Sequence, residues 1–253
     1  MSLFPRLAAA DSRLALIIDE HAWTYAQLAE AALQHAALLE RVGVESGERV
    51  AVWAHPSPST AAAMLGNFAA GVTTIPLNPK LGSGEVAHIF RDSDPKLAFC
   101  AESFDVPHEV LHVPSLRAAY APGEGALADI DEDATPGLIL YTSGTTGPPK
   151  GAVITRANIA ANLDSLIEAW EWTARDTVVH SLPLIHAHGL VLGLLGSLRV
   201  GGALHFVPKF SPAGIAAAFT DARHQDTMCV AVPTMYHRIE EAAEESPALC
   251  KAF

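Results

Sequence analysis

Short apolar runs alternate along the chain with longer segments in which apolar residues recur at helical spacing. The runs have the length and the Val, Ile and Leu content of buried strands, and Gly or Pro often follows them. We predict strands at residues 14–18, 49–54, 72–76, 96–100, 137–141, 152–154, 176–180, 203–207 and 227–232. We predict helices at residues 24–42, 58–70, 83–92, 156–172, 191–198 and 212–222, and a last helix that begins at Pro233.

Strands and helices follow one another about every 20–25 residues, which is typical of βαβ units. The predicted fold class is therefore α/β, with mainly parallel sheets and flanking helices. Residues 101–135 interrupt the rhythm with prolines, glycines and an acidic run, and they predict a surface connection with one small strand at 109–113. We expect a first α/β part over 1–100, this connection over 101–135, and a second α/β part over 136–253.

Composition narrows the classes of partner and compartment. The chain has 253 residues, is 50% hydrophobic and carries a net charge of −12, which disfavours nucleic acid and anionic membranes as partners. Three scattered cysteines without a C-x-x-C pair are typical of a reducing compartment, so we expect a cytoplasmic protein. No apolar run reaches the roughly 18 residues that a membrane-spanning helix needs.

The richest stretch of candidate chemistry lies between the two predicted strands at 137–141 and 152–154. Glycines there let backbone N–H groups approach a ligand, hydroxyls donate to anionic oxygens, and a lysine adds a positive charge. Such a set predicts a phosphate cradle, made of Thr142, Ser143, Gly144, Thr145, Thr146, Gly147 and Lys150. A polar hairpin turn is the alternative, although turns seldom carry four donor side chains in eight residues. The stretch is not a Walker A loop, because Gly151 and no Ser or Thr follows Lys150.

A second candidate is the H-x-H pair His186 and His188, which follows the predicted strand at 176–180. A zinc site needs a third ligand, and neither H-E-x-x-H nor a cysteine pair is present, so we predict no metal here. Two partly buried imidazoles at a strand-to-helix turn are the plain structural alternative.

A third candidate is Arg238, in the helix that begins at Pro233. Its guanidinium suits a carboxylate, which predicts a substrate with a second carboxylate at its far end. The alternative is a surface arginine that pairs with Glu241 or Glu244.

The stretch from Ser143 to Gly151 resembles throughout the signature Ser-Gly-Thr-Thr-Gly-x-Pro-Lys-Gly of the AMP-forming acyl-CoA synthetases, the adenylate-forming family. Further segments extend the resemblance over about residues 20–240 and are most similar to malonyl-CoA synthetases. These segments are Pro76–Lys80, Ala87–Ile89, Trp170–Thr173, Leu182–Gly193 and Val232–Ile239.

The resemblance implies a two-step reaction with ATP, Mg²⁺ and coenzyme A. A carboxylic acid, here malonate or methylmalonate, attacks the α-phosphate of ATP, and the CoA thiol then displaces AMP. In the family a His-Gly pair lies beside the reacting carboxylate and a Val-Pro-Thr segment lines the acid pocket. Carried onto this chain, the catalytic residue is His188, and the acid is bound by His188, Gly189, Thr234, Met235, Tyr236 and Arg238.

Full-length members of the family are about twice as long, and their adenine-binding, ribose-binding and catalytic-lysine segments would follow residue 253. We therefore expect a truncated N-terminal part of the large domain, which holds a triphosphate weakly and does not turn over alone. The alternatives are a ligase for a medium-chain or aryl monocarboxylate, a non-catalytic ATP-binding remnant, and a carrier-protein-loading adenylation domain. The sequence does not predict an oligomeric state.

Overall fold

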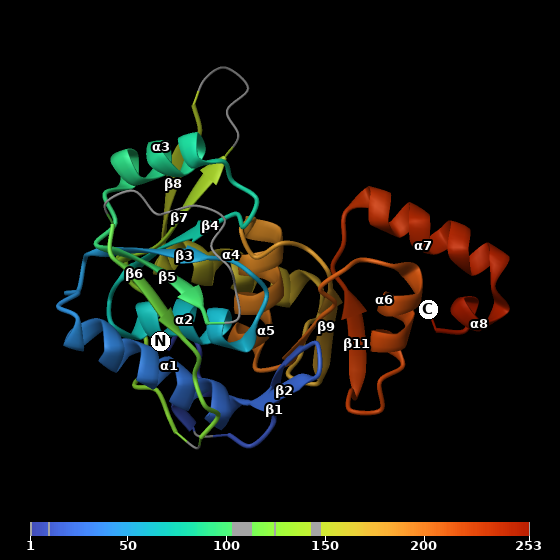
Figure 1. Cartoon of the computed structure of the whole chain (residues 1–253). Coiled ribbons are helices and arrows are strands. Elements are labelled where there is room, and N and C mark those ends of the chain that lie inside the picture. The colour runs from blue at the N-terminus through green and yellow to red at the C-terminus, as the bar shows by residue number, and fades with distance from the viewer. Residues whose placement is uncertain (1, 10, 103–112, 124, 143–147, 253) are drawn as a thin grey trace.

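The computed structural model describes residues 2–9, 11–102, 113–123, 125–142 and 148–252. Two sheets organise these residues, a six-stranded sheet in the order β6-β5-β3-β4-β7-β8 and a five-stranded sheet in the order β11-β9-β10-β1-β2 (Figure 1). Parallel pairs predominate in both sheets, which confirms the predicted α/β fold with mainly parallel sheets.

The six-stranded sheet is built from the middle of the chain. Its last pair, β7 and β8, is antiparallel, so the predicted phosphate cradle connects the two strands of a hairpin. The small strand expected at 109–113 lies outside the described residues except for Val113, and a strand follows it at β6. The strands are β3 (Arg49–Trp53), β4 (Thr73–Leu77), β5 (Leu97–Ala101), β6 (Ser115–Ala118), β7 (Pro136–Thr142) and β8 (Lys150–Thr155).

The five-stranded sheet joins the two ends of the described chain. Its strand β1 pairs in parallel with β10, and Leu16 lies opposite Leu204. Its strands are β1 (Leu14–Ile18), β2 (His21–Thr24), β9 (Asp176–His180), β10 (Ala203–Phe206) and β11 (Asp226–Cys229). Each sheet contains strands from both predicted parts, 1–100 and 136–253. The division of the chain into these parts stays a prediction.

The helices begin where the sequence offers a cap. Thr24 accepts a hydrogen bond from the backbone N–H of Gln27 and so caps α1, as predicted, while Ser57 caps α2 in the same way. The helices are α1 (Tyr25–Arg41), α2 (Pro58–Ala69), α3 (Ser83–Ser93), α4 (Arg156–Ala169), α5 (Gly196–Val200), α6 (Pro212–Phe219), α7 (Pro233–Glu245) and α8 (Pro247–Cys250). A 3₁₀ turn spans Leu7–Ala9, and a π-helix spans His188–Leu195. No helix of the described residues is long and apolar enough to cross a membrane.

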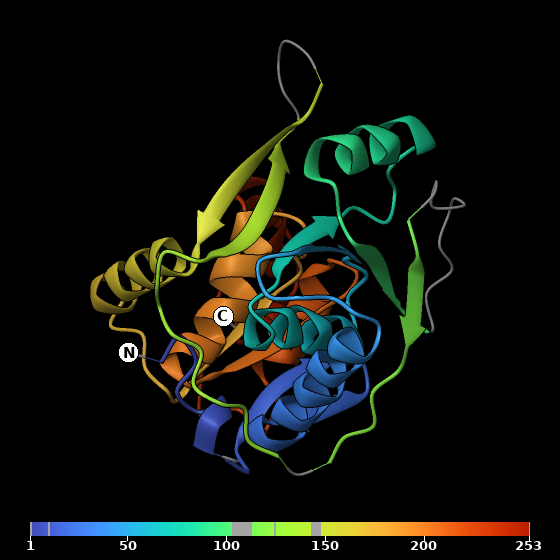
Figure 2. The same cartoon turned by 90° about the vertical axis from the view of Figure 1, so that its left-hand side faces the viewer.

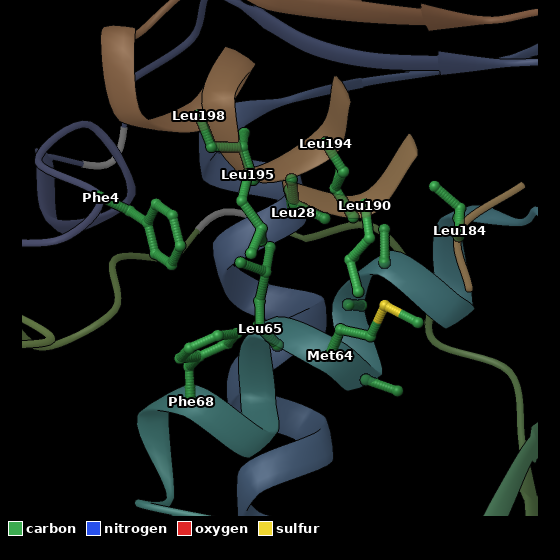
Figure 3. Close-up of a cluster of buried hydrophobic side chains, with 14 of the residues drawn as sticks. Phe4, Leu28, Met64, Leu65, Phe68, Leu184, Leu190, Leu194, Leu195 and Leu198 are labelled. Carbon is green, nitrogen blue, oxygen red and sulfur yellow. The ribbon is translucent and has the colours of Figure 1, made fainter. Parts of the chain in front are cut away.

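The main hydrophobic core lies where α1 and α2 meet the π-helix and α5. Leu28 of α1 and Met64 and Leu65 of α2 point toward Leu190 and Leu194, and all five side chains are fully buried (Figure 3). Viewed from the side, α1 and α2 lie in front of the π-helix and α5 (Figure 2). The core therefore ties the helices of the six-stranded sheet to the segment that carries His188.

A buried polar network crosses this interior. His35 of α1 lies with its Nδ1 2.5 Å from Tyr120 Oη and its Nε2 2.9 Å from Asn67 Oδ1. Asn67 uses its amide N–H to donate to Thr74 Oγ1, so its oxygen accepts from His35 Nε2, and Nδ1 accepts from Tyr120. The network is satisfied only by a neutral imidazole, and burial lowers the pKa of His35 to about 4.

Candidate active site

The predicted phosphate cradle begins at the carboxyl end of β7. Thr142 and Lys150 lie opposite one another as the last residue of β7 and the first residue of β8, and both are exposed. Ser143, Gly144, Thr145, Thr146 and Gly147 lie outside the described residues. In Figures 1 and 2 this end of the β7–β8 hairpin lies beside α3, and Thr142 and Lys150 are the last pair before the connecting loop.

Helix α3 holds the two strands of this hairpin from one side. Tyr141 Oη donates to Asp92 Oδ2 at 2.6 Å, and His88 Nε2 donates to the carbonyl oxygen of Pro149 at 2.8 Å. Burial, followed by the hydrogen bond to Asp92, raises the pKa of Tyr141 to about 12, so this hydroxyl keeps its proton. Sequence reasoning assigned no role in the site to Asp92 or His88, although His88 lies in one of the resembling segments, because only the folded chain brings α3 beside the hairpin.

The second part of the site is a cleft of about 320 Å³ where the segments after β9 and β11 meet. These two strands are parallel neighbours, so their carboxyl ends lie at the same edge of the sheet, where α/β proteins commonly bind ligands. Two of the predicted acid-binding residues, His188 and Tyr236, line this cleft. The other lining residues are Trp170, Met228, Cys229, Val230 and Ala231.

His188 begins the π-helix that was predicted as an ordinary helix three residues later. The next residue, Gly189, packs so closely on the preceding loop that a Cβ there would lie 2.4 Å from the carbonyl oxygen of Pro183. Only glycine fits this position, so the π-helix packs directly against the backbone of Leu182 and Pro183 next to His188. A π-helix at this point is consistent with a functional site, where such segments are frequent.

A second histidine, His180, lies beneath the π-helix. The ring is fully buried, its Nδ1 accepts from the backbone N–H of Leu182 at 3.0 Å, and Gly193 leaves room for Nε2. Burial, with a smaller contribution from the nearby His188, lowers the pKa of His180 to about 3. A neutral ring therefore supports the segment that carries His188, a role that the sequence motif alone did not indicate.

Tyr236 reaches the cleft from the first turn of α7. Its hydroxyl donates to the carbonyl oxygen of Cys229 at 2.8 Å, which fixes the ring against β11. Burial raises the pKa of the Cys229 thiol to about 11, so this side chain is a neutral, apolar wall. Thr234 is exposed, and Met235 packs against the main core.

Arg238 lies on α7 but is not among the residues that line the cleft. Its guanidinium carbon lies 4.9 Å from the centre of the Phe210 ring, a cation–π contact. The structure therefore brings His188 and Tyr236 together, whereas Thr234 and Met235 are not among the residues that line the cleft. Arg238 stacks on the Phe210 ring.

Comparison with known proteins adds a family to this geometry. The family model described as AMP-binding enzyme matches residues 6–252. A malonate–CoA ligase of Arabidopsis thaliana is 31% identical over 277 aligned positions, which cover 92% of this chain and 45% of that protein. The chain thus spans about half the length of the curated relatives that it matches.

Two solved structures share the fold over nearly the whole chain. A malonyl-CoA ligase in a ternary product complex with methylmalonyl-CoA and AMP has a TM-score of 0.84 and 43% identity, over 98% of this chain and 53% of that one. The O-succinylbenzoate CoA synthetase of Bacillus subtilis, in complex with AMP, has a TM-score of 0.83 and 28% identity, over 95% and 63%.

Proposed function

The chain belongs to the AMP-binding enzyme family, and from this premise we propose that it is part of an AMP-forming acid–CoA ligase that activates malonate or methylmalonate. The observation that carries the proposal is the meeting of His188 and Tyr236 in one cleft, at the carboxyl ends of adjacent parallel strands. The names of the relatives support the acid–CoA ligase class, and two of them support a malonate-type acid.

The first chemical task is to offset the negative charge of a triphosphate while an anionic carboxylate approaches it. Lys150 and Thr142 lie opposite one another at the loop end of the hairpin, so an ammonium and a hydroxyl can donate to phosphate oxygens together. We assign Ser143, Gly144, Thr145, Thr146 and Gly147 to the same cradle on their residue types. Mg²⁺, which is bound largely through substrate phosphates in such sites, would add charge at the triphosphate.

The second task is to hold and orient the acid. His188 can donate a hydrogen bond to a carboxylate from the mouth of the cleft, and Gly189 keeps the neighbouring backbone free of a side chain. Tyr236 lines the cleft from α7, and we assign Thr234 and Met235, beside it on this helix, to the wall that limits the size of the acid. A small acid suits a cleft of about 320 Å³.

Arg238 is the residue that we assign to the distal carboxylate of the acid. To reach the cleft, its side chain must leave Phe210 and turn along α7. An exposed cation–π contact contributes about 0.5–1 kcal/mol, whereas a hydrogen bond to a charged group contributes about 1.5–3 kcal/mol. A bidentate contact with a carboxylate is therefore sufficient to offset the loss of the Phe210 contact.

The proposed reaction joins these parts in order. A carboxylate oxygen of the acid attacks the α-phosphorus of ATP and pyrophosphate leaves, which gives the acyl-adenylate. The thiolate of CoA then attacks the acyl carbon and AMP leaves. His188 and Arg238 position the acid for the first step, and the hairpin offsets charge on the leaving pyrophosphate.

A monocarboxylate ligase is the second candidate, and the apolar wall of the cleft favours it. Trp170, Met228 and Val230 line the cleft, and no arginine or lysine of the described residues lines it with them. A medium-chain or aryl acid would bury apolar surface against this wall with no need of Arg238.

The test is a pyrophosphate-release assay on this chain joined to the C-terminal half of a malonate–CoA ligase. Malonate, methylmalonate, acetate, butyrate and benzoate are offered with ATP and CoA. We expect the dicarboxylates to react best, and Arg238→Ala to lower kcat/KM for malonate by about 10–100-fold with little effect on butyrate. His237→Gln, on the exposed face of the same helix, is the matched control. A preference for butyrate or benzoate that Arg238→Ala leaves unchanged would refute the dicarboxylate assignment.

A further inference from the structure

Away from the cleft, a histidine interrupts an apolar face of the five-stranded sheet. In the middle strand β10, His205 lies between Ile17 of β1 and Val179 of β9, and both of these neighbours are fully buried. Its own side chain is only 14% exposed. An imidazole in such a place needs polar partners, because an unpaired polar group is costly to bury.

Its partners come from the tight turn between α6 and β11. Asp221 and His224 are the ends of this turn, in which the backbone N–H of His224 donates to the Asp221 carbonyl oxygen at 3.0 Å. His224 Nε2 lies 3.3 Å from His205 Nδ1, and Asp221 Oδ2 lies 3.9 Å from the same atom. One ligand atom from each of the three residues lies within 4.8 Å of the others.

From this arrangement we propose that His205, Asp221 and His224 form a binding site for a divalent transition metal, with zinc as the ion of choice. Two imidazoles and one carboxylate suit zinc, whereas calcium and magnesium prefer oxygen ligands alone. A water molecule from the partly open side would complete four ligands.

The distance between the two ring nitrogens supports a shared ion. At 3.3 Å the two nitrogens are slightly farther apart than the donor and acceptor of an N–H···O hydrogen bond, for which the range is about 2.7–3.2 Å, so a hydrogen bond between them is a long one. Two Zn–N bonds of about 2.0–2.1 Å at a tetrahedral angle, however, place their nitrogens about 3.3 Å apart. His205 Nδ1 and His224 Nε2 therefore already have the separation of two ligands of one zinc ion. The carboxylate oxygen Asp221 Oδ2, 3.9 Å from His205 Nδ1, has to move about half an ångström closer to that nitrogen to reach the same separation.

The turn also fixes the carboxylate. The backbone N–H of Arg223 donates to Asp221 Oδ1 at 2.9 Å, so this oxygen is held by the chain itself, as outer hydrogen bonds commonly hold metal ligands. The other oxygen, Oδ2, faces His205 and forms an ion pair with the Arg223 guanidinium.

Arg223 thus competes with a metal for Asp221 Oδ2. Its side chain is 47% exposed, so the guanidinium can turn into solvent when an ion binds. The guanidinium also donates through Nε to Asp221 Oδ1 at 2.9 Å, so a metal has to offset the loss of a pair that contacts both carboxylate oxygens. Removal of Arg223 therefore distinguishes a metal site from a cluster that only stabilises the fold. It frees Asp221 Oδ2 and should strengthen metal binding, whereas in a cluster without a metal it would only abolish the ion pair.

The test uses the untagged chain, stripped of metal with a chelator and titrated with Zn²⁺ by calorimetry and with Co²⁺ by visible absorption. We expect one Zn²⁺ per chain and the absorption bands of tetrahedral Co²⁺. His205→Gln and His224→Gln should each weaken zinc binding at least about 100-fold, more than is usual for outer partners of a metal ligand. Arg223→Gln should tighten it by up to about fivefold.

His237→Gln is the matched control, because His237 lies next to Glu240 and Glu241 on the exposed face of α7 and could hold adventitious zinc. This variant should bind zinc as the unchanged chain does. Thermal melting with and without Zn²⁺ tests variants whose stability is reduced. A variant of a metal ligand should lose the zinc-dependent rise in Tm, whatever its Tm without metal. Zinc that binds equally to His205→Gln and His224→Gln, or that is lost with His237→Gln or Arg223→Gln, would overturn the proposal.

Discussion

Acidification from pH 7.5 to pH 5 should unfold this protein far more readily than its carboxylates alone would predict. His35 and His180 are both fully buried, and burial lowers their pKa values to about 4 and about 3, below the value of 6.5 for an accessible histidine. The unfolded chain therefore binds more protons than the folded chain as pH falls through 6.5 toward 4. Stability is fully present above this window and is lost on the way down.

The size of the effect follows from the two pKa differences. At pH 5 an accessible histidine is almost fully protonated while both buried rings are still neutral, so each ring lowers the free energy of unfolding by about 2 kcal/mol relative to neutral pH. Together they remove about 4 kcal/mol, a large share of the roughly 5–15 kcal/mol that stabilises a typical protein. Protonation of His35 would in addition deprive the Tyr120 hydroxyl of its acceptor.

Urea denaturation at several pH values between 7.5 and 5, followed by tryptophan fluorescence and circular dichroism, measures this loss. His35→Gln removes one titrating ring, so it should flatten the pH dependence by about 1.4 kcal/mol per pH unit below pH 6, whatever it does to stability at pH 7.5. The exposed His237→Gln is the control and should leave the slope unchanged. A loss below about 1 kcal/mol by pH 5, or a slope that His35→Gln leaves intact, would refute the reasoning.

Two further substitutions test the geometry of the candidate site. Gly189→Ala should lower the free energy of unfolding by about 1–3 kcal/mol, because its Cβ would lie 2.4 Å from the Pro183 carbonyl oxygen. Gly84→Ala, where no atom lies within 4 Å of the added Cβ, is the control and should stabilise helix α3 slightly. Urea denaturation compares the two variants. Lys150→Ala should weaken ATP binding by this chain about tenfold or more in calorimetry, with little change in Tm. Lys209→Ala, at another exposed lysine, is the control and should leave ATP binding unchanged. Equal dissociation constants for the two variants would contradict the phosphate-cradle assignment.

The elements of the fold were predictable because each signal is local. Apolar runs such as 14–18 and 176–180 became the strands β1 and β9, and the hydroxyl of Thr24 began α1 where a cap was expected. The pairing of strands was not predictable in this way. Nothing within residues 137–154 indicates that β7 takes β4 as its parallel neighbour, and Trp23, expected before a helix, ends up in strand β2.

For the candidate site too, local motifs were predictable from the sequence, and contacts between distant segments were not. The motif around His188 and the segment after Val232 each supply a residue that lines the cleft, but Cys229 lies in no such segment, and Trp170, in a segment that resembles malonyl-CoA synthetases, was assigned no role in the site. They are brought there because β9 and β11 are neighbours, a fact of tertiary structure. The side chain of Arg238 could not be placed either, since a guanidinium suits an aromatic ring as well as a carboxylate.

The pairing of β1 with β10 has a consequence for how the protein is made. A ribosome that adds about 5–20 residues per second completes β10 roughly 10–40 s after β1, because Leu16 and its partner Leu204 are about 190 residues apart. During that interval the apolar strand Leu14–Ile18 has no parallel neighbour and only the short hairpin with β2 to shield it. The nascent chain therefore passes through a stage in which the unpaired edge of this apolar strand is exposed. Chaperones that bind extended apolar segments should bind it at this stage, before the five-stranded sheet forms.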